Sequence, residues 1–154
     1  WLSRQFGFAA DSIVEAEIVM ADGSQRIINE KNNPDLFWAL HGGSGNFGIV
    51  TALEFKLHPV ADAFAGTVYY SPNKADAIMK AYRDWAPTLP EIFTASLLHI
   101  QLPPIEHLPE IIRGKKVLAL ELFYNGNPKD GEALLAPFYK RVGEPLHTVV
   151  QPTR

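Results

Sequence analysis

The spacing of apolar side chains in the first part of the chain has the two-residue period of β-strands. From Ile13 to Met20, apolar residues alternate with glutamates, which predicts a half-buried strand. Asp22-Gly23 supplies a tight turn, and residues 26–28 return as the partner of a hairpin. A second alternating run from Ile49 to Leu57 ends at Pro59 and predicts another strand.

A short helix is predicted between these strands. Asn33 and Pro34 are typical of a helix start, because asparagine can cap free backbone N–H groups and proline already has a helical φ. The helix is expected to run through Leu40 and to end at Gly42-Gly43.

The pattern changes near residues 59–62, which predicts a boundary between two parts. Beyond it we expect strands at 64–70, 93–101, 117–124 and 146–150, a helix from Ser71-Pro72 and a helix at 133–142 interrupted by Pro137. This β-α-β-β-α-β order is that of a ferredoxin-like antiparallel sheet with helices on one face. The predicted fold class is α+β, with the end of an α/β lobe followed by this sheet.

Composition and charge exclude several kinds of protein. A hydrophobic content of 47% with 20% charged residues suits a chain with an ordinary core. The net charge of −3 and the lack of a basic run argue against nucleic acid or a membrane as partner. Cysteine is absent and the histidines lack metal-binding spacings, so no metal site is expected. The sequence does not distinguish a soluble cytoplasmic protein from an exported one.

Residues 43–48 (GSGNFG) match the G-x-G-x-x-G pattern that brings backbone close to a dinucleotide pyrophosphate. A Rossmann loop follows a strand and opens a helix, whereas this loop follows a helix and opens a strand. The context argues against a nicotinamide dehydrogenase. A plain flexible connection and a backbone surface that a ligand approaches closely both stay open.

Three blocks of the sequence stand out: residues 1–12 (WLSRQFGFAADS), the turn at 21–23 (ADG) and residues 33–51 (NPDLFWALHGGSGNFGIVT). In this order they resemble the berberine-bridge-enzyme-like branch of the vanillyl-alcohol oxidase and p-cresol methylhydroxylase superfamily of FAD-linked oxidases. Beyond Phe64 the likeness weakens and corresponds to the start of the family's substrate domain. The resemblance thus covers essentially the whole chain.

Three positions depart from the family pattern. His41 stands where the family commonly has Arg, Ser44 where it usually has Gly, and Ser12 where Asn is frequent. His41 argues against a permanent cation at that position.

The resemblance implies the cofactor, the reaction and the division into domains. Family members hold FAD between flavin-binding lobes and a substrate domain, and they oxidise a C–H or C–OH bond by hydride transfer to the flavin. Residues 1–60 would be the C-terminal part of an FAD-binding (PCMH-type) domain, and residues 61–154 the N-terminal part of the substrate domain. The chain starts without Met and stops in an apolar stretch, so we expect an internal fragment that is inactive alone.

By the same resemblance, the glycine loop and the strand after it would lie along FAD. The expected cofactor-binding residues are Gly45, Asn46, Phe47, Gly48, Ile49 and Val50. The family's covalent histidine and its catalytic Tyr or Glu fall outside these residues, so no catalytic residue is assigned. His99 and Gln101, on one face of the strand at 93–101, are candidate substrate contacts, although an ordinary polar face is the simpler interpretation.

The expected partners are a small-molecule substrate and an electron acceptor such as oxygen. A non-catalytic α/β binding module stays open as an alternative, since the chain carries no complete catalytic set. The tryptophans are expected to be packing residues; they are Trp1, Trp38 and Trp85.

Overall fold

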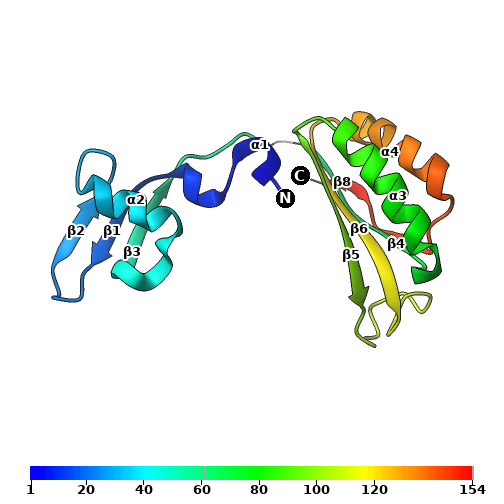
Figure 1. Ribbon diagram of the computed structural model, residues 1–154, viewed down its shortest axis with the longest axis horizontal. Helices are drawn as coiled ribbons and strands as arrows, with labels where there is room; N and C mark the ends of the chain where they lie inside the picture. The colour runs from blue at the N-terminus through cyan, green and yellow to red at the C-terminus, as the bar shows by residue number, and fades with distance from the viewer. Residues whose placement is uncertain (61, 154) are drawn as a thin grey trace. The chain divides into compact units, whose positions relative to one another are not determined.

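The computed structural model describes residues 1–60 and 62–153 of the 154-residue chain (Figure 1). The chain divides into two compact units. The first unit is Phe6–Pro59, and the second is Trp1–Gln5 together with Val60–Arg154. In sequence, the first unit is therefore an insertion into the second. The division at Pro59 lies where the pattern changes, but the first five residues pack with the second unit and not with the first.

The first unit is a three-stranded antiparallel sheet of order β2-β1-β3 with a helix on one face. Its elements are α1 (Ser3–Phe6, which begins in the second unit), the 3-10 turns η1 (Ala9–Ser12) and η2 (Ser44–Phe47), β1 (Ile13–Val19), β2 (Gln25–Ile28), α2 (Pro34–Gly43) and β3 (Ile49–Phe55). The helix α2 packs through Phe37 on Ala16, Ile18 and Ile28. The predicted hairpin, helix and following strand are confirmed, although β3 ends two residues earlier than predicted.

The start of α2 differs from the predicted cap. Asn33 has a left-handed backbone (φ 54), which asparagine tolerates better than most residues. Its side-chain Nδ2 donates to the carbonyl oxygen of Ile27 at 3.0 Å, while its own carbonyl accepts from the N–H of Phe37. The expected capping of the helix by the Asn33 side chain is thus wrong, because that side chain ties the helix start to the hairpin instead.

The second unit is an antiparallel sheet of order β5-β6-β4-β7, with β8 also paired to β4. Its elements are β4 (Ala63–Tyr70), η3 (Pro72–Lys74), α3 (Ala75–Trp85), η4 (Ala86–Thr88), β5 (Phe93–Gln101), β6 (Lys116–Asn125), α4 (Pro128–Val142), β7 (His147–Thr148) and β8 (Gln151–Thr153). Both helices lie against one face of the sheet (Figure 1). The predicted ferredoxin-like α+β arrangement is confirmed.

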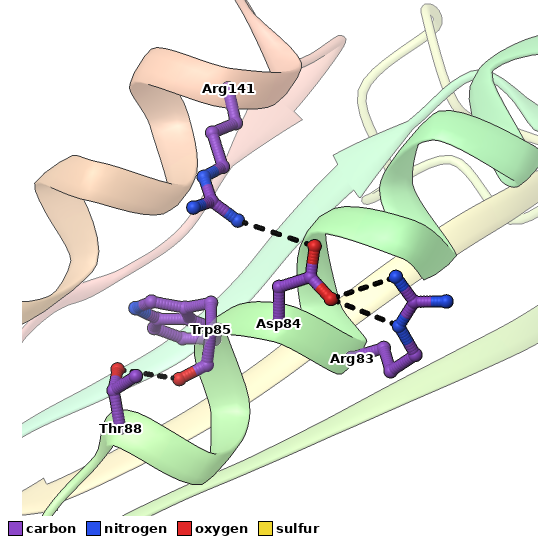
Figure 2. A network of polar contacts seen from close by, with 5 residues as sticks. All are labelled: Arg83, Asp84, Trp85, Thr88 and Arg141. Atoms are coloured by element: carbon purple, nitrogen blue, oxygen red, sulfur yellow. Dashed lines mark hydrogen bonds and ion pairs between the residues drawn. The ribbon is translucent and has the colours of Figure 1, made fainter.

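An apolar core holds the two helices of the second unit on the sheet. Its fully buried members include Val68, Tyr70, Ile78, Phe93, Leu120, Leu122, Leu135 and Phe138. Each such side chain contributes on the order of 1.5–3 kcal/mol by burial. The helices are also linked by Asp84 of α3, whose carboxylate lies 3.7 Å from Arg141 of α4 and 2.9 Å from Arg83 (Figure 2). These charged groups are exposed, so the link adds at most about 1 kcal/mol.

The helix α4 begins five residues earlier than predicted. Asn127 accepts a hydrogen bond from the N–H of Lys129 at 3.0 Å, and Pro128 occupies the first turn. The helix also continues through Pro137 instead of being interrupted there. Of the predicted last strand at 146–150, only His147–Thr148 (β7) is a strand, and β8 (Gln151–Thr153) follows beyond the predicted range. Among the residues that the structure describes, none of the helices combines the length and apolar character needed to cross a bilayer.

Candidate functional site

The glycine loop is shaped by a break in helical geometry at the end of α2. His41 has ψ 30 and Gly42 has φ 157, so the chain leaves the helix before its last assigned residue. The His41 Nδ1 donates to the carbonyl oxygen of Phe37 at 2.7 Å, and its ring meets the Phe37 ring edge-on with centroids 4.6 Å apart. Because Phe37 is buried in the core of the first unit, this contact anchors the start of the loop to the sheet.

Two predicted cofactor contacts use their side chains to fold the loop. The Asn46 Nδ2 donates to the carbonyl oxygen of Gly43 at 2.8 Å. The Phe47 ring occupies the space that a Cβ on Gly43 would need, so any side chain at position 43 would displace this ring. Both residues nevertheless remain exposed, so a ligand could reach their side chains as well as their backbone.

The two remaining glycines of the loop play different parts. Gly48 has φ 149, and a Cβ there would lie 2.5 Å from the carbonyl oxygen of Val19 and 2.9 Å from the Ile18 side chain. Gly48 is thus needed for β3 to start beside β1. A Cβ on Gly45 would meet nothing within 4 Å. Folding alone does not demand a glycine at position 45, which leaves room for a ligand to approach the backbone.

The loop and the start of β3 suit an anionic ligand. No charged residue occurs from Gly42 to Leu53, so the loop itself contributes no carboxylate that would repel a phosphate, and the neighbouring Glu17 of β1 lies further along β3, beside Thr51 and Ala52. Ile49 is 72% exposed, whereas Val50 packs against the core of the first unit. An open, neutral, glycine-rich backbone beside an exposed apolar side chain fits the pyrophosphate and nucleoside parts of FAD.

In the second unit, the face of the sheet opposite the helices carries a group of polar and aromatic side chains. The register pairs Ser96 of β5 with Glu121 of β6, and Thr94 with Phe123. Trp1 meets the Phe123 ring edge-on at 6.0 Å between centroids. These five side chains line a shallow hollow of about 80 Å³. We call this surface the open face.

The open face could have been found from the sequence. On β5, Phe93, Ala95 and Leu97 contact the helix-covered core, whereas Thr94 and Ser96 alternate with them. A period-2 strand puts such polar residues on the other side of the sheet. This alternation was present in the sequence but was not used to choose candidates.

His99 and Gln101 continue the series of alternate residues of β5 whose earlier members contact the core, so they belong to the side of the sheet that carries the helices. They pair with Leu118 and Lys116 and remain exposed. The Gln101 Nε2 donates to the carbonyl oxygen of Gly114 at 2.7 Å. The strand register does not bring His99 and Gln101 together with Ser96 and Glu121. Contact of His99 and Gln101 with substrate stays a prediction.

The three tryptophans have different surroundings. Trp85 is buried, and its Nε1 donates to the carbonyl oxygen of Leu134 at 2.9 Å, as expected of a packing residue. Trp38 is 80% exposed and Trp1 is 64% exposed within the described part of the chain. The packing prediction is therefore wrong for Trp1 and Trp38 in this structure.

Comparison with known proteins gives a consistent assignment, although no protein-family model matches the chain. The FAD-linked oxidoreductase YgaK of Bacillus subtilis is 32% identical over 92% of this chain and 34% of its own length. The FAD-linked oxidoreductase pgmH of Aspergillus terreus is 30% identical over 90% of this chain and 28% of its own length. The chain thus spans about a third or less of these relatives.

Solved structures share the fold across both units. A variant of Physcomitrella patens BBE-like 1 superposes with a TM-score of 0.79 and 25% identity, covering 99% of this chain and 31% of that one. The glucooligosaccharide oxidase of Acremonium strictum superposes with a TM-score of 0.73 and 27% identity, covering 98% of this chain and 30% of that one. Over nearly its whole length the chain is therefore similar to FAD-linked oxidoreductases in sequence, and it shares the fold of the berberine-bridge-enzyme-like and glucooligosaccharide oxidase FAD enzymes.

Proposed function

We propose that this chain forms part of the cofactor site and part of the substrate site of a longer FAD-dependent oxidoreductase that oxidises a small organic substrate at a C–H or C–OH bond. The observation that carries the proposal is the glycine loop. Its backbone is open at Gly45, it lacks charge, and it occurs in a fold shared with FAD-linked enzymes.

The residues that would hold FAD are Gly45, Asn46, Phe47, Gly48, Ile49 and Val50. Main-chain N–H groups of the loop would donate to phosphate oxygens, and the exposed Ile49 side chain would cover an apolar part of the cofactor. Asn46 and Val50 would act by holding the loop and the strand in place. When bound, FAD supplies the redox chemistry by accepting a hydride from the substrate.

We further propose that the open face of the second unit is a wall of the substrate site. Ser96 and Thr94 offer hydroxyl groups, Glu121 offers a carboxylate, and Trp1 and Phe123 offer aromatic surface. This mixture of a few polar groups with aromatic side chains is typical of small-molecule sites. His99 and Gln101 are the competing candidates, on the side of the sheet that carries the helices.

The electron acceptor is proposed to be oxygen or another small oxidant. One relative, of Penicillium roqueforti, is named an FAD-dependent monooxygenase, and the neighbour from Acremonium strictum is named an oxidase. The names of these two relatives, a monooxygenase and an oxidase, support the choice of oxygen for the present chain.

The longer protein that contains this chain should be purified and examined for the visible absorbance of flavin. We expect one bound flavin per protein and bleaching of its absorbance by a substrate under anaerobic conditions. In that protein, Ser96→Ala and Glu121→Gln should raise KM, whereas His99→Ala should leave it unchanged. A protein without flavin would instead support a non-catalytic binding module.

A further inference from the structure

In the second unit, the side of the sheet opposite the helices has a small apolar core of its own at one end. Val117 of β6 alternates with residues that contact the helices, so it belongs to the side that carries the open face. Val117 is nevertheless fully buried. The side chains packed with it come mainly from the connection between β5 and β6, and they are Leu102, Leu108, Ile112, Tyr69 and Leu146. This connection therefore folds back over the sheet beside the open face.

Hydrogen bonds fix the shape of this connection, residues 102–115, which we call the end wall. The Arg113 Nε and Nη2 donate to the carbonyl oxygen of Leu108 at 2.9 and 2.8 Å, and Nη2 also donates to that of Glu106 at 2.7 Å. The Gln101 Nε2 donates to the carbonyl oxygen of Gly114 at 2.7 Å. Because one planar guanidinium binds two backbone carbonyls, the end wall is organised before any ligand arrives.

The open face has a row of polar side chains across three strands. Glu121 of β6 pairs with Ser96 of β5 and with Thr67 of β4. Directly paired residues lie on the same side of a sheet, so the carboxylate stands between two hydroxyl groups. This row can accept and donate hydrogen bonds to one end of a ligand.

Between this polar row and the end wall, β5 presents apolar side chains. Leu98 and Ile100 follow Ser96 on the same side of the strand, and both are exposed. Ile100 pairs with Val117, the residue that the end wall buries. The positions of Ser96 and Ile100 differ by four residues, which corresponds to about 13 Å along an extended strand.

We propose that the end wall sets the length of the substrate, and that the substrate has a hydrogen-bonding group at the polar row and an apolar body over Leu98 and Ile100. The apolar body ends at the end wall, about 13 Å from the polar row. Arg113 is a positioning residue, because it acts by holding the backbone of residues 106–108. The inference rests on the proposed function, since it assigns a class of substrate to the open face.

A tethered probe measures this length without a known substrate. The chain has no cysteine, so Ser96→Cys gives a single thiol at the polar row. This thiol is converted to mixed disulfides with alkyl methanethiosulfonates of about four to twelve carbons, and the measured quantity is the concentration of 2-mercaptoethanol that releases half of the probe. That concentration should rise about two- to fourfold per methylene while the probe covers apolar side chains. The rise should end at about ten carbons, where the probe reaches the end wall.

Substitution of Arg113 tests whether the end wall causes this limit. In Arg113→Ala the rise should continue for about two more carbons or longer, because the backbone of the end wall is released. Arg113→Lys cannot bind both carbonyls through a planar group and should give a smaller shift, and it carries the comparison if the alanine variant does not fold. Arg83→Ala, which removes an exposed arginine of α3, is the matched control and should leave the limit unchanged. A rise without an end, or the same end in the variants of Arg113, contradicts the proposal.

The direction in which the probe lies is tested at both sides of the polar row. Leu98→Ser should lower the gain per methylene, whereas Trp1→Ala should not, because Trp1 lies beside Phe123 on the other side of that row. A gain that depends on Trp1 and not on Leu98 would contradict an apolar body directed towards the end wall.

Hydrogen exchange shows whether Arg113 acts by holding the end wall. The amides of Leu108, Ile112 and Gly114 donate to carbonyl oxygens within the end wall. They should exchange about two- to tenfold faster in Arg113→Ala, in a variant with the circular dichroism of the unsubstituted chain, and not in Arg83→Ala. Unchanged exchange would contradict the role of Arg113.

These measurements separate the inference from the proposed function, since none of them involves flavin. A longer protein without flavin would overturn the proposed function and leave the length limit as a property of a binding surface. A longer protein with flavin, but whose chain shows no limit on probe length, would overturn the end wall alone.

Discussion

The carbonyl oxygen of Val19 lies 2.5 Å from the point where a Cβ on Gly48 would stand. Val19 ends β1 and Gly48 precedes β3, which pairs with β1 from Ile49 onwards. A side chain at position 48 would separate the two strands where their pairing begins. Gly48 is thus a requirement of the fold, whatever else it does for a ligand.

Gly48→Ala should lower the free energy of unfolding of the flavin-free first unit by about 1–3 kcal/mol, because the left-handed backbone and the contact with Val19 both oppose a side chain. Urea denaturation provides the measurement. Gly45→Ala is the control and should change the free energy by less than about 0.5 kcal/mol. Equal losses in the two variants would contradict the different parts assigned to these glycines.

His41→Leu should destabilise the first unit by about 1 kcal/mol, since it removes the donor to the Phe37 carbonyl. His41→Gln, whose amide can donate to the same oxygen, should recover part of the loss. The amides of residues 42–48 should exchange faster in the leucine variant, as measured by hydrogen exchange and mass spectrometry. Identical exchange in the leucine and glutamine variants would show that the hydrogen bond does not organise the loop.

Tyr70→Phe should be neutral or stabilising near neutral pH. The Tyr70 hydroxyl is buried and has no hydrogen-bond partner among the described residues, so its removal leaves nothing unpaired. Thermal unfolding at about pH 7 checks this directly. A clear loss of stability in the variant would indicate a partner for the hydroxyl, such as a buried water.

Tyr70 also predicts how the stability of the fold changes at alkaline pH. Burial, together with Tyr139 and Glu144, raises the pKa of Tyr70 above its ordinary value of 10.0. The fold thus favours the neutral hydroxyl, and this stabilisation is present below about pH 10 and is lost as pH rises further. In Tyr70→Phe the free energy of unfolding should still fall at alkaline pH, but less steeply, because burial also raises the pKa of Tyr139. An unchanged alkaline slope in the variant would contradict the assignment.

Local sequence signals predicted most of the fold because they act over a few residues. The predicted bounds of β5 were correct because the alternation of side chains begins and ends within the sequence itself. The β-α-β-β-α-β order then follows from reading the predicted strands and helices along the chain. The early start of α4 was missed although Asn127 and Pro128 are typical of a helix start. The packing of residues 1–5 with the second unit depends on contacts such as Arg4 with Phe93, which no local pattern contains.

The candidate site was predicted only in part. The loop was located because its glycines recur in the family, but their separate parts depend on which atoms stand beside each one. Gly43 faces the Phe47 ring, Gly48 faces Val19, and Gly45 faces open space. The open face was missed although Thr94 and Ser96 alternate along β5 with residues that contact the core, and only their pairing with Phe123 and Glu121 depends on the folded sheet.

The isolated chain should not retain FAD, since it spans about a third or less of its FAD-linked relatives and offers only part of a cofactor site. Refolding it with excess FAD, followed by desalting, provides the measurement. Stoichiometric yellow protein would show that these residues hold a more complete site than we propose.

The most direct test of the proposed cofactor site compares FAD binding by the unsubstituted longer protein with binding by its Gly45→Val variant, alongside the unfolding of each flavin-free form. A valine at position 45 meets no atom of the folded chain at its Cβ, so the free energy of unfolding should change by less than about 0.5 kcal/mol. The affinity for FAD should fall by about tenfold or more, because the side chain would occupy the space where the cofactor approaches the backbone. Unchanged affinity for FAD in a normally folded variant would contradict a cofactor site at this loop.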